Sequence, residues 1–137
     1  MTQDEQEAYV RERWENVGIK HYHIDGICYW MVHQHGSGIP LHGYESPELA
    51  WAEAAEFTEQ RLEEIRKVER EASVQAYAIS ALREQINDWC TLPGVVLEQV
   101  RTLCAMCRTR ARLDQKLTEL KRGMKETLPR RQERNKT

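Results

Sequence analysis

The chain has 137 residues, a formal net charge of −2, and 31% charged against 40% hydrophobic residues. This balance suits one domain, residues 1–137, with a modest core and a heavily solvated surface. No apolar run approaches the ~20 residues of a membrane span, and the N-terminus lacks the basic start and apolar stretch of a secretory signal. Four cysteines are too few for a disulfide scaffold. We therefore expect a cytoplasmic protein without a membrane partner.

Residues 1–17 predict an N-terminal helix, and residues 18–44 predict a small antiparallel sheet of two or three strands. Asp25-Gly26 separates two runs rich in β-formers and indicates a two-residue hairpin turn, with a third strand near Ile39–His42. This turn places residue 23 opposite 28 and residue 21 opposite 30. One face then carries Ile19, His21, His23, Cys28, Trp30 and Val32. The other face is the more apolar, so we expect it to pack on a helix.

Two long helices follow, at 46–90 and 94–128, before a basic tail at 129–137. Ser46 is a candidate N-cap, Pro47 suits the first helical position, and a break near Ser73 is an alternative to one continuous helix. Pro93-Gly94 predicts a reversal. The predicted class is therefore α+β, mostly α, with the small sheet followed by a long antiparallel two-helix hairpin that resembles a coiled coil.

Hydrophobic spacing supports this hairpin. Apolar residues repeat at heptad spacing in the first helix, with Gln75 at one seam position. A turn at 91–94 makes facing residue numbers sum to about 185, and every other resulting pair is apolar: Trp89–Val96, Ile86–Val100, Leu82–Leu103, Ile79–Met106, Ala72–Leu113, Val68–Leu117 and Ile65–Leu120. Residues 45–72 have a net charge of −5 and residues 114–137 a net charge of +4. This pattern favours the same register.

The histidines and cysteines raise the question of metal binding. His21, His23 and Cys28 should lie close together on one sheet face, and two imidazoles with a thiolate are ligand types that Zn²⁺ accepts. The alternative is a set of solvated or partner-contacting side chains. Cys104 and Cys107 have CxxC spacing inside a helix, away from the helix N-terminus where redox motifs lie, and we interpret them as small core thiols.

Charge asymmetry raises the question of nucleic-acid binding. Residues 101–137 have a net charge of +8, whereas residues 1–100 have −10. Pairing within the hairpin explains part of this contrast, and phosphate binding is the alternative. The candidate phosphate contacts are Arg101, Arg108, Arg110, Arg112, Arg130 and Arg131. No nucleophile elbow, phosphate-binding loop, zinc-protease motif or dinucleotide fingerprint is present, so the sequence does not predict an enzyme.

Two short stretches resemble a known family. Tyr29-Trp30-Met31-Val32 and the segment from Gly43 to Trp51 are similar to the sheet–helix half of AP2-like and phage integrase arm-type DNA-binding domains, over residues 27–57. The resemblance implies a sheet followed by one helix. Those domains contact DNA through arginine-rich strands, whereas residues 19–44 contain Lys20 and no arginine. The chain also has the general look of small accessory proteins of phages and prophages.

These observations favour a non-catalytic interaction protein, a small phage-type regulator or inhibitor that binds a host or phage protein complex. The hairpin would form a rigid arm, and aromatic and histidine side chains would form the partner-binding patch. Its members are His21, His23, Trp30, Trp14 and Tyr44. A two-helix hairpin leaves apolar surface that a second copy would cover, so we expect a homodimer. A nucleic-acid binder and a zinc protein are the alternatives, and no other cofactor is expected.

Overall fold

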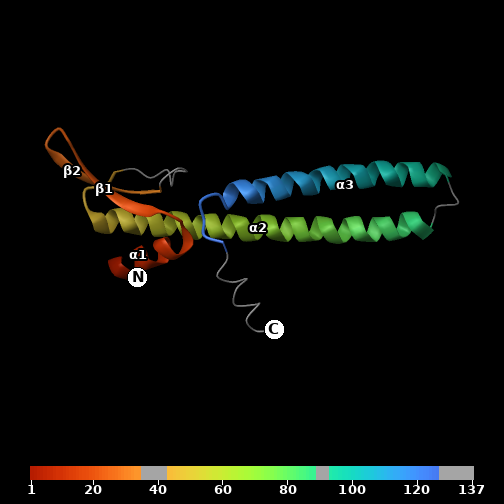
Figure 1. The fold of residues 1–137 in the computed structure, drawn as a ribbon. Helices are drawn as coiled ribbons and strands as arrows, with labels where there is room; N and C mark the ends of the chain where they lie inside the picture. Colours follow the sequence, from red (N-terminus) through yellow and green to blue (C-terminus); the bar gives the residue numbers. More distant parts are fainter. Residues whose placement is uncertain (35–42, 89–92, 127–137) are drawn as a thin grey trace. The chain divides into compact units, whose positions relative to one another are not determined.

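The computed structural model describes residues 1–34, 43–88 and 93–126. The order of elements is α1 (Gln3–Arg13), β1 (Val17–Ile24), β2 (Ile27–Gln34), α2 (Pro47–Asp88) and α3 (Pro93–Leu120), as drawn in Figure 1. This confirms a mostly helical α+β fold in which a small antiparallel sheet precedes a long helical hairpin. None of the helices is both long and apolar enough to cross a membrane, within the described residues.

The chain forms two compact units. Unit 1 comprises Met1–Leu62 and the segment that starts at Arg122, and unit 2 comprises Glu63–Lys121. The predicted third strand near Ile39–His42 and the basic tail at 129–137 lie outside the described residues.

Helix α1 begins with a capping box, in which the Thr2 hydroxyl accepts a hydrogen bond from the Glu5 N–H and the Glu5 carboxylate reaches back to the Thr2 backbone. It ends at Arg13, so the prediction of helix to residue 17 is wrong. Trp14 is extended, at φ −117° and ψ 142°, and Asn16 has φ 55°. These two conformations turn the chain directly into β1.

The sheet has the predicted register, with His23 opposite Cys28 and His21 opposite Trp30. The prediction of which face packs on the helix is wrong. Val32 is 1% exposed and lies in the core with Ile19 and Trp30 packed against that core. The opposite face ends in Ile24 and Ile27, whose side chains at the tip of the hairpin are exposed. Among the described residues, the hairpin meets the core through Val17, Ile19, Trp30 and Val32, which share one face, so total apolarity along the strands was a misleading measure.

The core of unit 1 packs α1, the sheet and the first turns of α2 together. Small side chains of α2 leave room for the side chains of α1 and the strands to pack against this helix beside its Trp51. The fully buried members are Val10, Trp14, Val32, Ala50, Trp51, Ala54 and Ala55. The segment after α3 joins the same unit, because the Lys125 N–H donates to the Arg13 carbonyl and the Glu15 N–H donates to the Gly123 carbonyl. Met124 packs against the core from this segment.

Helix α2 starts where the sequence predicts, with the Leu49 N–H donating to the Ser46 hydroxyl over 3.2 Å. It is continuous over 42 residues, so the alternative of a break near Ser73 is wrong. Within unit 2, α2 and α3 run side by side in opposite directions (Figure 1). Ion pairs join Lys116 to Glu64 over 3.8 Å and Lys121 to Glu69 over 3.2 Å. The paired numbers sum to 180 and 190, on either side of the predicted 185.

The predicted seam residues of α2 are buried in unit 2: Ile65, Val68, Ala72, Ile79 and Leu82. Helix α3 ends at Leu120 rather than at the predicted residue 128. Gly123 has φ 79°, a conformation that glycine adopts freely and that stops a helix. The chain can then leave the hairpin and join the core of unit 1.

Candidate functional sites

The tip of the β1–β2 hairpin brings three candidate metal ligands together, namely two imidazoles and one thiol. Asp25 and Gly26 have φ values of 52° and 80°, as a two-residue turn with a positive φ at both positions requires. This turn fixes the cross-strand pair His23–Cys28 and leaves His21 two residues away on the same face. The ligand atoms of the three residues all lie within 4.8 Å of one another.

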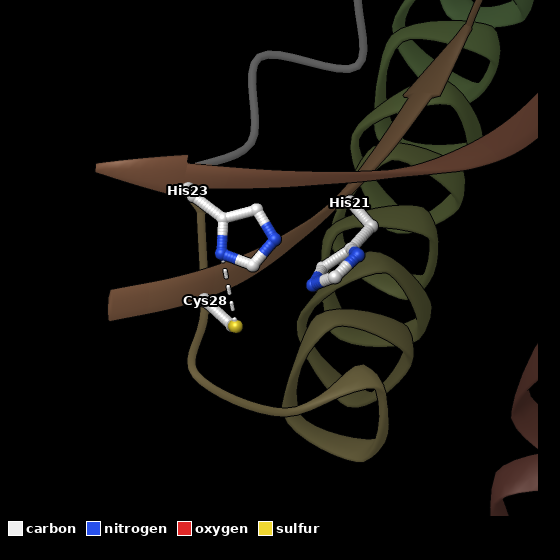
Figure 2. A group of neighbouring side chains, drawn as sticks. All are labelled: His21, His23 and Cys28. Atoms are coloured by element: carbon white, nitrogen blue, oxygen red, sulfur yellow. Dashed lines mark hydrogen bonds between the residues drawn. The ribbon is translucent and has the colours of Figure 1, made fainter. Parts of the chain in front are cut away.

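Figure 2 shows the three side chains next to one another, with His23 in contact with each of the other two. The Cys28 Sγ lies 3.2 Å from the His23 Nδ1, at hydrogen-bond distance. The His21 and His23 rings meet edge to face with centroids 4.8 Å apart. Both histidines are exposed and Cys28 is half-buried, so the cluster is open to solvent.

Trp30 connects this cluster to the core of unit 1. Its ring stacks on His21 with a centroid separation of 4.4 Å and an interplanar angle of 20°. Its backbone N–H donates to the Tyr44 carbonyl over 2.6 Å, and the Tyr44 N–H donates back to the Trp30 carbonyl over 2.8 Å. Trp30 therefore holds the His21 ring against a fixed part of the fold.

Four of the five residues in the predicted partner-binding patch are accessible to solvent. His21, His23, Trp30 and Tyr44 lie in unit 1 and are exposed or half-buried. Burial of the Tyr44 hydroxyl, with the charges of Glu53 and Glu56 nearby, raises the pKa of this tyrosine above its ordinary value. Trp14 was wrongly placed in the patch: it is 3% exposed, and its indole N–H donates to the Thr58 hydroxyl inside the core.

The predicted phosphate contacts divide into three groups. Arg110 pairs with Asp114 over 3.4 Å. Arg101, Arg108 and Arg112 are exposed on α3, with no ion pair among the described side chains, and their spacing of 7 and 4 residues places them on one stripe. Arg130 and Arg131 lie outside the described residues.

The interpretation of both CxxC cysteines as core thiols is wrong for Cys104. Its side chain is exposed, and Cys107 is half-buried. Both lie in the interior of α3, away from a helix N-terminus. They therefore lack the helix N-terminus at which redox CxxC motifs lie.

Helix α2 carries a second stripe, which we call the outer stripe and which was not among the predicted sites. It repeats at intervals of 3 and 4 residues outside the seam, and its Lys67, Arg70 and Val74 border a groove that Thr109 and Leu113 of α3 also line. Its residues are Lys67, Arg70, Val74, Tyr77, Ala81 and Glu84. Val74 is 67% exposed and Tyr77 is 80% exposed. The heptad spacing of these residues is present in the sequence. It was not recognised as a contact surface because the stripe mixes charged and apolar side chains.

Comparison with known proteins adds no relative: no family model, curated protein or solved structure matches the chain. Function must therefore be argued from the sites themselves.

Proposed function

We propose that the chain is a non-catalytic interaction protein that forms a homodimer through the outer stripe of α2. The exposure of Tyr77 and Val74 at the centre of this stripe carries the proposal. Large apolar side chains at heptad spacing on a helix usually pack against another helix. The seam already packs within unit 2, so the outer stripe remains open to a partner, and its Val74 and Tyr77 are more exposed than the apolar Leu97 and Val100 of α3.

The order of side chains along the stripe favours a second copy of the same helix. The stripe begins with the basic residues Lys67 and Arg70, continues with Val74, Tyr77 and Ala81, and ends with the acidic Glu84. Two copies aligned antiparallel bring the basic end of one against the acidic end of the other. Such a surface is self-complementary, as a two-fold interface requires.

This symmetry defines the contacts. A two-fold axis near Tyr77 makes facing numbers sum to about 154. Tyr77 then faces its own copy, Val74 faces Ala81, and Arg70 faces Glu84. The two Tyr77 rings gain a stacking contact. The Val74–Ala81 pair, which the two-fold axis repeats, loses its solvent exposure.

A second layer of helices also suits the hairpin. Over the part of α3 whose burial is described, 96–120, every side chain is exposed or half-buried. A hairpin of two helices covers only one seam, whereas helical domains commonly complete their cores with further helices.

The dimer is tested by sedimentation equilibrium of the purified full chain. The expected mass is twice the 16.1 kDa of one chain. Tyr77→Lys places two like charges at the two-fold axis and should yield a monomer. Tyr77→Phe keeps the ring and should remain dimeric. Gln115→Lys adds the same charge at an exposed position of α3 and should also remain dimeric.

A charge swap tests the direction of the pairing. Arg70→Glu alone and Glu84→Arg alone should each weaken the dimer by on the order of tenfold, because each exposed pair contributes up to about 1 kcal/mol and the two-fold axis repeats it. The double variant should restore the original affinity. A monomeric native chain, or a double variant weaker than both single variants, would refute the proposed dimer.

We further propose that the dimer acts as a small regulator or inhibitor of a larger protein assembly, in a host or phage. Each copy of unit 1 would contribute one contact patch, formed by His21, His23, Trp30 and Tyr44. Two identical patches raise the avidity for an assembly that contains repeated subunits.

Nucleic-acid binding is the second candidate function, and the exposed stripe of Arg101, Arg108 and Arg112 favours it. Three phosphate contacts predict that the logarithm of the affinity for duplex DNA falls with the logarithm of salt at a slope of about −2.7. The variant with all three arginines changed to glutamine should lose this binding. DNA binding that does not depend on salt, or no DNA binding, would rule out this second function and leave protein interaction as the proposed function.

A further inference from the structure

We propose that His21, His23 and Cys28 form a binding site for one Zn²⁺-class cation at the tip of the β1–β2 hairpin. The inference does not depend on the dimer, because all three residues belong to unit 1. It rests on ligand chemistry, on ligand spacing and on the way in which the hairpin holds the side chains.

The ligand chemistry selects the metal. One thiolate and two neutral imidazoles match Zn²⁺ and other borderline first-row cations, whereas Mg²⁺ and Ca²⁺ need oxygen ligands. Binding removes the thiol proton of Cys28, so the hydrogen bond between Cys28 and His23 is exchanged for two bonds to the metal. The fourth position of a tetrahedral site would be filled by water or by a side chain of a partner protein.

The ligand spacing is close to that of a tetrahedral site. Zn–N bonds of about 2.0 Å and Zn–S bonds of about 2.3 Å place neighbouring ligand atoms roughly 3.3 to 3.6 Å apart. The His23 Nδ1 and the Cys28 Sγ are already 3.2 Å apart, and all three ligand atoms lie within 4.8 Å of one another. Rotation of exposed side chains closes the remaining gap without moving the strands. In Figure 2 a nitrogen of each ring lies on the side of the sulfur atom.

The hairpin reduces the entropic cost of collecting these ligands. The turn at Asp25-Gly26 fixes the His23–Cys28 pair, and Trp30 stacks on His21. Groups that orient metal ligands commonly change metal affinity by about 10–100-fold. Trp30 is such a positioning residue for His21, because its backbone N–H and C=O both form hydrogen bonds with the backbone of Tyr44.

The test uses untagged full-length protein in which Cys90, Cys104 and Cys107 are changed to serine, so that Cys28 is the only thiol. Titration with Co²⁺ should produce a thiolate-to-cobalt charge-transfer band that saturates at one equivalent and disappears when Zn²⁺ is added. Elemental analysis after Zn²⁺ loading and desalting should give one zinc per chain.

Variants at the ligands decide whether these residues form the site. Cys28→Ser should abolish the band, and His21→Ala or His23→Ala should weaken Zn²⁺ binding by more than about 100-fold, beyond the usual effect of outer-shell changes. His33 lies on the opposite face of β2, so the His33→Gln variant should bind Zn²⁺ as tightly as the parent. A band that survives Cys28→Ser, equal losses in the His33 variant, or no stoichiometric zinc in the folded parent would overturn the proposal.

Folding is checked separately. Helical circular dichroism of each variant should match that of the parent, because the three ligands lie at the solvent-exposed tip of the hairpin. A ligand variant that loses both helical signal and metal is replaced by His21→Gln or His23→Gln, which retain a polar side chain of similar size. Normal zinc affinity in these folded variants would equally overturn the proposal.

Discussion

Thr58 is a polar side chain that is 0% exposed within unit 1 and uses its hydroxyl twice. It accepts a hydrogen bond from the Trp14 indole N–H over 2.9 Å and donates one to the Ala54 carbonyl over 2.7 Å. The second bond stays within α2, whereas the first joins α2 to the residue at the end of α1. One hydroxyl therefore sets the orientation of a large buried ring.

Thr58→Val should destabilise unit 1 by about 1–3 kcal/mol, because it leaves the buried Trp14 N–H without an acceptor at nearly constant side-chain volume. The change is measured by urea unfolding followed through tryptophan fluorescence. Thr118→Val is the matched control: its hydroxyl also donates to the carbonyl four residues earlier, but the side chain is exposed. The control should change stability by less than about 0.5 kcal/mol. Equal effects of the two changes would contradict the role of the Trp14 bond.

Residue-level prediction succeeded where chemistry is local. The Asp25-Gly26 turn and the Ser46 cap depend on a few adjacent residues, and both are confirmed. It failed for Trp14, because an aromatic side chain near a helix end can serve a core or a surface equally well. The deciding contact comes from Thr58, 44 residues away along the chain.

At the scale of elements, the α2–α3 pair shows how a heptad pattern specifies a hairpin. The seam of α2 is apolar except at Gln75, whose carboxamide oxygen is buried without a hydrogen-bond partner among the described residues. Burying such a group costs free energy, but a polar residue in a seam disfavours shifted registers. Gln75 therefore lowers the stability of the hairpin but helps to specify its register.

Gln75→Leu should stabilise unit 2 by about 1–2 kcal/mol, since it removes the unsatisfied oxygen and adds apolar contact. Urea unfolding followed by helical circular dichroism measures the change. Gln85→Leu, at an exposed position of the same helix, should leave stability within about 0.5 kcal/mol of the parent. A loss of stability in Gln75→Leu would show that this side chain has a partner in solution.

The predicted elements were more accurate in their starts than in their ends. Pro47 begins α2 as predicted, since proline suits the first helical turn. Helix α3 begins at Pro93, so Pro93 and Gly94 lie within the helix and the prediction that they form part of the turn at 91–94 is wrong. The end of α3 was missed by eight residues, although Gly123 is a local stop signal that the sequence contained. The hydrogen bonds of Gly123 and Lys125 to Glu15 and Arg13 fix the chain after this glycine, and they join distant parts of the sequence.

At the scale of the whole molecule, the two candidate sites lie in different units. Unit 1 holds the core built around Trp51 and the His21, His23 and Cys28 cluster. Unit 2 holds the hairpin and the outer stripe. The antiparallel pairing of the two helices was predictable because it follows from one reversal and one repeat. The joining of the C-terminal segment to unit 1 was not, since it has no periodic pattern.

The central claim of the proposed function is that two copies of α2 pair antiparallel about Tyr77. Disulfide cross-linking in a background without the four native cysteines tests it most directly. Val74→Cys and Ala81→Cys together should form a covalent dimer, because residue 74 of one copy faces residue 81 of the other. Within one chain the two positions lie two helical turns apart, about 10 Å, which is too far for a disulfide.

Each single variant should cross-link poorly, because antiparallel pairing leaves a cysteine at 74 about 10 Å along the helix from its copy. The account therefore predicts covalent dimer from the double variant at a concentration where the single variants remain monomeric under denaturing conditions. Efficient cross-linking of Val74→Cys alone would indicate parallel pairing. That result, or the absence of covalent dimer in the double variant, would contradict the account.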